Sequence, residues 1–210
     1  MADLKKIRFV TSNYDRLQGL KAVPTGLLLF LISLWANAQT GRARDLSLPL
    51  LIFLFGIFLY ALIDRHYRRN YGRVEQPPKF LWMDVVLSTV AALLALGGFG
   101  LDMTSKFPVS FYTLVFAIIL FFDYVRMIRR TGGLPLSTFP PALVFIGLMA
   151  LSAFLPMAGK ETWKEIGFRS PYFLVYGLNG ILILVYGIVV HLYLAGAMPS
   201  IREVKDEQPV

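Results

Sequence analysis

Six long apolar runs, separated by short polar segments, dominate the pattern of hydrophobic and polar positions along the chain. The runs cover residues 22–39, 46–63, 80–101, 108–128, 140–158 and 171–196. A helix that crosses a bilayer needs roughly 20 mainly apolar residues, so each run predicts one transmembrane helix. The pattern therefore predicts an all-α, polytopic integral membrane protein whose six spans form three hairpins.

The chain outside these runs is too short for a soluble domain. We expect a cytoplasmic amphipathic segment over residues 1–21, a transmembrane domain over 22–198 and a cytoplasmic tail over 199–210. Hydrophobic residues make up 56% of the sequence, which is above the average for a soluble protein. The sequence contains no cysteine, and this excludes disulfides, thiolate metal sites and cysteine nucleophiles.

The first run has an alternative interpretation as a secretory signal. It ends in Ala36-Asn37-Ala38, a small-x-small pattern that a signal peptidase can cleave. Cleavage would leave five spans. The polar segment before the run contains Asp3 and Asp15, whereas a signal peptide begins with a short basic region. We therefore keep six spans as the prediction.

The distribution of Lys and Arg predicts the orientation, because positive residues in short loops remain in the cytoplasm. In a six-span arrangement, 15 of the 21 basic residues fall on the side that holds both termini. We expect both termini in the cytoplasm and the protein in the cytoplasmic (inner) membrane. The formal net charge of +8 has the same origin, and since no nucleic-acid-binding motif accompanies it, we do not expect nucleic acid as a partner.

The segment DRHYRRNYGRVEQPP, residues 64–78, is the most basic part of the chain. We assign its four arginines to a cytoplasmic loop that follows the second span: Arg65, Arg68, Arg69 and Arg73. Such a loop fixes the topology and attracts anionic lipid headgroups. The alternative function is a docking surface for an acidic or phosphorylated cytoplasmic partner, because Arg binds phosphate and carboxylate groups with two parallel hydrogen bonds.

The N-terminal segment is amphipathic. Its apolar residues recur every three or four positions and form one helical face: Leu4, Ile7, Val10, Tyr14, Leu17 and Leu20. Basic residues lie off that face, so the pattern predicts an interfacial helix on the cytoplasmic leaflet.

Three ionisable side chains lie within the predicted spans: Asp84, Asp123 and His191. Ionisable residues inside a bilayer are rare and indicate a functional site until another role is found. All three have a similar depth near the cytoplasmic edge, so one hypothesis is a cluster that carries a proton or binds a cation. The alternative is a structural role, in which Asp84 stabilises the first turn of its helix and Asp123 pairs with Arg126.

The last span carries two neighbouring stripes of special residues. One stripe repeats every seven positions and contains Tyr172, Asn179, Tyr186 and Tyr193. The other contains Gly177, Gly180, Gly187 and His191. Small residues let membrane helices approach closely, and polar side chains form hydrogen bonds between helices. This pattern predicts that the last span is buried in the bundle or in a homo-oligomer; a translocation path lined by the tyrosines is the alternative.

No cofactor or metal site is expected from the sequence. A haem held by two histidines needs both at one depth in facing helices, and we place His66 in the loop after the second span and His191 in the last span. No phosphate-binding loop, zinc signature or nucleophile elbow is present.

Three functional classes remain open. The preferred one is a non-catalytic membrane subunit, sensor or anchor for a cytoplasmic partner, because it needs only a basic inner face. A transporter or channel for a small solute, ion or proton is the first alternative, although the central parts of most spans offer few polar residues. An intramembrane enzyme is the second, and it would depend on Asp84, Asp123 and His191.

Overall fold

The computed structural model describes residues 14, 17–38, 47–71, 78–104, 107–130, 140–158, 164–165, 167 and 170–196. The 3₁₀ helix η1 (Gly19–Ala22) continues into α2 (Val23–Ala38). The remaining long helices are α3 (Ser47–Tyr71), α4 (Pro78–Thr104), α5 (Phe111–Arg130), α6 (Pro140–Ser152) and α8 (Pro171–Ala195), and the 3₁₀ helix η3 (Leu155–Ala158) follows α6.

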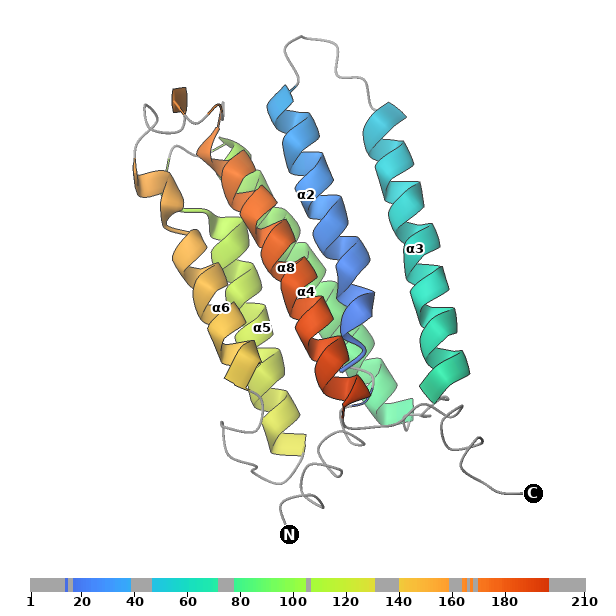
Figure 1. Ribbon diagram of the computed structural model, residues 1–210. Helices are drawn as coiled ribbons and strands as arrows, with labels where there is room; N and C mark the ends of the chain where they lie inside the picture. The colour runs from blue at the N-terminus through green and yellow to red at the C-terminus, as the bar shows by residue number, and fades with distance from the viewer. Residues whose placement is uncertain are drawn as a thin grey trace, which may run out of the picture.

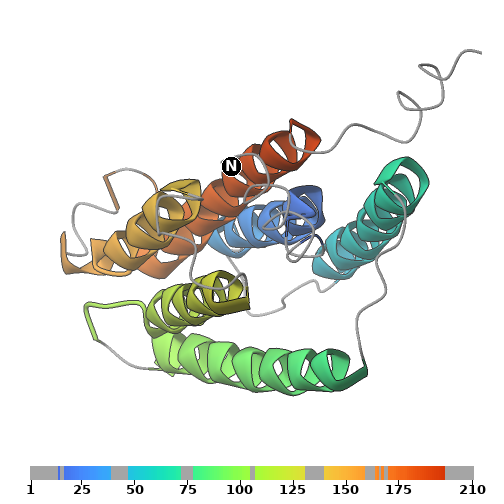
Figure 2. The ribbon, with the colours of Figure 1, turned by 90° about the horizontal axis from the view of Figure 1, so that it is seen from below.

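Helix α8 lies in the middle of the bundle (Figure 1). Its most extensive contact is with α2, and it also contacts α6 and α5. Helix α3 packs on the far side of α2, and α4 packs on α5. Seen from below, α6, α8, α2 and α3 form one row with α3 at its edge, and α4 and α5 lie together on one side of that row (Figure 2). Each expected hairpin is present as a pair of contacting helices: α2 with α3, α4 with α5, and α6 with α8.

The expected number of apolar helices of membrane-crossing length is confirmed within the described residues. Six helices are long and apolar enough to cross a membrane. Many of their large apolar side chains point outward: Leu51 on α3 is 61% exposed and Leu96 on α4 is 67% exposed. This surface is compatible with a multi-pass membrane protein, because exposed apolar patches of this extent are rare on soluble monomers.

The two ends of the bundle are named by the helix termini that they hold. We call the end that holds Gly19 and Ala195 the terminal end, and the end that holds Ala38 and Pro171 the far end (Figure 1).

The helices continue past the apolar runs that predicted them: α3 extends to Tyr71 and α4 to Thr104.

Helix α6 stops at Ser152 and is replaced by a turn and η3. Pro156 explains this interruption, because proline has no N–H for the carbonyl four residues earlier and its ring collides with that carbonyl. The carbonyl of Ala153, the residue that follows α6, accepts a hydrogen bond from the N–H of Ser110 (2.8 Å). The break thus connects α6 to the start of α5.

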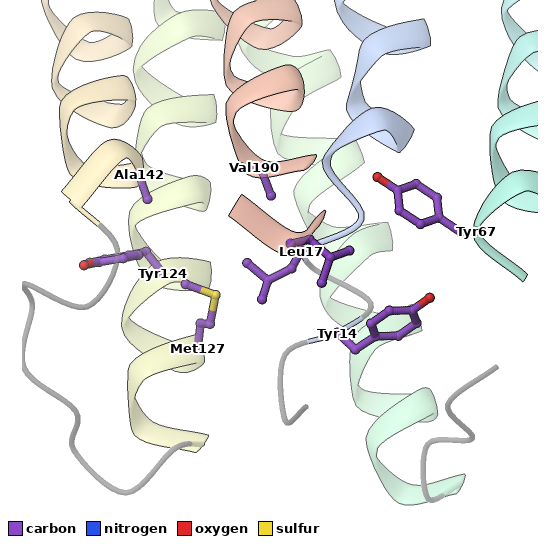
Figure 3. Close-up of a cluster of buried hydrophobic side chains, with 8 residues drawn as sticks. Tyr14, Leu17, Tyr67, Tyr124, Met127, Ala142 and Val190 are labelled. Atoms are coloured by element: carbon purple, nitrogen blue, oxygen red, sulfur yellow. The ribbon is translucent and has the colours of Figure 1, made fainter. Parts of the chain in front are cut away.

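Part of the N-terminal segment enters the bundle. Tyr14 and Leu17 are only 2% and 1% exposed. They belong to a buried cluster at the terminal end that also contains Tyr67, Tyr124 and Val190 (Figure 3). Two residues of the expected amphipathic face are therefore part of the core, while residues 1–13, 15 and 16 lie outside the described residues.

Candidate functional site

Tyr67 connects three elements at the terminal end. Its side chain is 1% exposed and points from α3 toward η1 and α8 (Figure 3). The hydroxyl accepts a hydrogen bond from the N–H of Leu20 (3.2 Å) and lies 2.9 Å from Nδ1 of His191. Since the hydroxyl proton is not used by Leu20, it can be donated to Nδ1, which places the proton of a neutral imidazole on Nε2.

Ion pairs add to this connection. Asp64 on α3 forms ion pairs with Lys21 of η1 (2.6 Å) and with Arg68 one turn later (2.7 Å). The ammonium group of Lys21 also lies 5.7 Å from the centre of the Tyr60 ring. Asp64 is 21% exposed, so these pairs are partly screened by solvent. Their main effect is to position the last turns of α3.

The basic segment is helical over most of its described length. Arg65, Arg68 and Arg69 lie in the last two turns of α3, and all three are exposed. The assignment of these three residues to a loop was wrong, because the helix continues where Asp64 and Tyr67 make contacts within the bundle. Arg73 lies outside the described residues.

The three ionisable residues singled out in the spans have different surroundings. Asp84 lies in α4, but its side chain is outside the described part of the structure. Asp123 on α5 is exposed and lines a groove shared with α4. His191 faces α3, where it contacts Tyr67. A single cluster of the three residues stays a prediction.

His66 and His191 lie closer together than the sequence suggested. Their ring centres are 6.3 Å apart, and the Tyr67 ring lies 5.9 Å from one and 5.7 Å from the other. The sequence analysis separated the two histidines by placing His66 in a loop. That placement was wrong, because His66 belongs to α3. The three rings pack edge to face, and among the described residues no group of three or more His, Cys, Asp or Glu side chains is arranged to bind a metal.

Two hollows meet at Asp123. A groove of about 730 Å³ runs between α4 and α5, and its lining includes Ser88, Asp123, Arg126 and Arg129 among apolar residues. A smaller cavity of about 200 Å³ lies between α5, α6 and α8 and is lined by Asp123, Tyr186 and Leu17, among others. Asp123 and Leu120 line both spaces.

The glycines of α8 lie against η1 and α2. A Cβ atom added to Gly180 would lie 2.7 Å from the carbonyl oxygen of Gly26, and one added to Gly187 would lie 2.7 Å from the carbonyl oxygen of Gly19. Gly177 similarly faces Ser33. The two helices are antiparallel along this seam, and the backbones approach so closely that no side chain fits between them.

The tyrosine and asparagine stripe of α8 faces the other half of the bundle. Asn179 is fully buried; its Nδ2 donates to Oγ1 of Thr113 on α5 (2.8 Å), and its Oδ1 accepts from Oγ of Ser152 on α6 (2.9 Å). The ring of Tyr186 stacks on Phe145 with 4.3 Å between ring centres. Tyr172 donates to the carbonyl of Phe107, and Tyr193 packs against the core cluster at the terminal end.

Asp102 is a buried carboxylate that sequence reasoning did not find. It is 1% exposed at the far end of α4. Its oxygens accept hydrogen bonds from the Ser110 hydroxyl (2.7 Å), the N–H of Phe111 (2.6 Å) and the hydroxyl of Tyr176 (2.8 Å). The predicted third span ended at residue 101, directly before Asp102, so no role was predicted for this carboxylate. Ser110, near the start of the apolar run over residues 108–128, was the available signal for a helix N-terminus nearby.

The Asp102 network has a structural explanation. The carboxylate satisfies N–H groups in the first turn of α5, where negative charge is favourable. The Ser110 hydroxyl oxygen also lies 3.0 Å from that of Thr113, whose hydroxyl can donate to it, and this contact links Asp102 to Asn179 and Ser152. These hydrogen bonds connect α4, α5, α6 and α8 in the far half of the bundle.

No protein-family model matches this sequence, and comparison with curated proteins and with solved structures likewise gives no match.

Proposed function

We propose that the protein is a multi-pass protein of the cytoplasmic (inner) membrane and acts as a non-catalytic subunit, sensor or anchor for a cytoplasmic partner. Six apolar helices and their exposed apolar surface support insertion into a bilayer. The excess of Lys and Arg on the side of the two termini supports an orientation with the terminal end in the cytoplasm.

The observation that carries this proposal is the basic end of α3. The helix has 25 residues, or about 37 Å at 1.5 Å per residue, and a hydrocarbon core is only about 30 Å thick. Its last turns therefore extend beyond the core. Tyr67 and Asp64 hold this end against η1 and α8.

Arg65 and Arg69 are one turn apart on this end, and both are exposed. Two guanidinium groups on a fixed helix can each form paired hydrogen bonds with phosphate or carboxylate. Because the helix is already ordered, binding does not require the backbone to lose further conformational freedom. This favours a partner with an acidic or phosphorylated surface.

Affinity purification of the full chain in mild detergent tests the proposal. We expect a cytoplasmic protein to co-purify in a fixed ratio, and to be lost from the variant Arg65→Gln/Arg69→Gln. The matched control is Arg42→Gln/Arg44→Gln, which removes the same charge from the segment between the first two spans. A partner retained by both variants, or no partner at all, would refute docking at α3.

Transport is a second candidate because Asp123 and Tyr186 line an internal cavity next to the α4–α5 groove. If the purified protein were a homo-oligomer that moved protons or cations into vesicles, and Asp123→Asn abolished that flux, transport would replace the subunit hypothesis.

A further inference from the structure

The groove between α4 and α5 differs in polarity along its length. Toward its deeper end it is lined by apolar residues that include Ala91 and Phe122, and Arg126 and Arg129 lie toward the terminal end. From Ile119 to Arg129 the groove follows about 15 Å of α5 at 1.5 Å per residue. That length is close to the depth of one leaflet, which is half of a hydrocarbon core of about 30 Å.

The charges that line the groove favour an anion at the membrane surface. Arg126 is half-buried and Arg129 is exposed, while Asp123 lies about one turn deeper. Among the described residues of the lining, two guanidinium groups and one carboxylate leave one net positive charge, and the other polar side chain is that of Ser88. The groove volume of about 730 Å³ lies within the range of roughly 300–1,000 Å³ that is typical of ligand sites.

We infer that this groove binds one anionic phospholipid of the cytoplasmic leaflet. An acyl chain lies along the apolar part, and the phosphate contacts Arg126 and Arg129. Arginine suits this contact because its planar donors match two phosphate oxygens. The inference rests on the proposed insertion and orientation in the membrane, but it does not depend on a cytoplasmic partner.

The test measures lipid preference inside the groove. Phe122 is 67% exposed and lines the groove, so Phe122→Trp provides a local fluorophore once Trp35, Trp82 and Trp163 are replaced by Phe. The full chain is reconstituted in phosphatidylcholine vesicles that contain increasing fractions of brominated phosphatidylglycerol or brominated phosphatidylcholine. Bromine quenches the tryptophan, so the two titrations give the relative association constant of the anionic lipid.

One net positive charge predicts a preference for phosphatidylglycerol of roughly fivefold, since a basic residue near the surface contributes about that factor. Arg126→Gln/Arg129→Gln should remove the preference. Asp123→Asn should increase it, because it removes the opposing charge. Unfolding would lower the lipid preference in both variants. A decrease in one variant and an increase in the other would therefore show an effect on the site and not on the fold.

Two controls locate the effect. Arg65→Gln/Arg69→Gln removes the same charge from α3 and should leave the preference at Phe122→Trp unchanged. Ala91→Phe fills the groove and should lower the preference, whereas Ala92→Phe, on a neighbouring exposed position that does not line the groove, should not. Equal quenching by the two lipids in the parent protein, or a preference that survives Arg126→Gln/Arg129→Gln, would refute the lipid site. Failure of the protein to float with the vesicles would instead refute the membrane placement itself.

Discussion

The seam between α2 and α8 gives the sharpest prediction about stability, because it depends on glycine at a defined contact. We consider Gly180→Ala, which adds a single methyl group. That methyl carbon would lie 2.7 Å from the carbonyl oxygen of Gly26, 2.7 Å from the N of Phe30 and 2.9 Å from the Cβ of Phe30. Two of these atoms are backbone, so they can move away only if the helices separate.

The expected loss follows from two opposing contributions. Overpacking a close contact typically costs about 1–3 kcal/mol. Replacing Gly by Ala inside a helix gains up to about 1 kcal/mol from helix propensity. Gly147→Ala on α6 is the matched control, because an added Cβ there has nothing within 4 Å. It isolates the propensity gain, so the difference between the two variants should be about 1–3 kcal/mol.

Reversible unfolding in mixed detergent micelles, followed by circular dichroism, measures this difference. Gly26→Ala should resemble Gly180→Ala, because its Cβ would lie 2.7 Å from the carbonyl oxygen of Gly180. The double variant should cost less than the sum of the two, since both changes separate the same pair of helices. If Gly180→Ala were as stable as Gly147→Ala, the close approach of α2 and α8 would be wrong.

Three further predictions use the same unfolding assay. Asn179→Leu removes hydrogen bonds to Thr113 and Ser152. It should lower the free energy of unfolding by about 1 kcal/mol, since each hydrogen bond between membrane helices contributes about 0.6 kcal/mol on average. A more stable variant would contradict a buried amide at this contact. Asp102→Asn replaces one carboxylate oxygen by an NH₂ group, which would face the Phe111 N–H or the Ser110 and Tyr176 hydroxyls, and it should lower the free energy of unfolding by about 1–3 kcal/mol. Asp102→Glu keeps the carboxylate and should lose less stability. Equal stability of the parent and the Asn variant would exclude the capping role. Tyr67→Phe leaves the N–H of Leu20 without its partner and should lower the free energy of unfolding by about 1 kcal/mol. Tyr60→Phe, at a residue that is 47% exposed, should have little effect. A larger loss of stability in Tyr60→Phe than in Tyr67→Phe would refute the role given to Tyr67.

The helices could be predicted from the sequence because the membrane-crossing requirement is simple. Long apolar runs predict helices of membrane-crossing length, and the six runs correspond to six helices that are long and apolar enough to cross a membrane. Helix ends were less predictable. Polar residues such as Asp64 and Asn70 mark the end of an apolar run but not the end of α3, because a helix can continue into the polar region wherever its side chains find partners.

The contacts of particular polar residues could not be predicted from one sequence. Asp102 has an ordinary position near a span end, and only the approach of Tyr176 and Ser110 from other helices makes it buried. Tyr67 lies within the basic segment of the sequence, but in the structure its side chain turns toward η1 and α8 and is buried. One signal was present and was not used: Gly19, Gly26 and Ser33 recur every seven residues, as do Gly180 and Gly187 on α8, which lie opposite Gly26 and Gly19.

The central position of α8 has a consequence for how the protein is made. When η3 has been synthesised, five of the six apolar helices of membrane-crossing length have been made, but the helix that contacts α2 on one side and α5 and α6 on the other has not. Until Pro171–Ala195 has been synthesised, the glycine face of α2 lacks the glycines of α8, and the side chains of Thr113 and Ser152 lack the amide of Asn179. Assembly of the bundle therefore waits until α8 has been synthesised, and a chain truncated before Pro171 would expose these surfaces of α2, α5 and α6 without the helix that covers them.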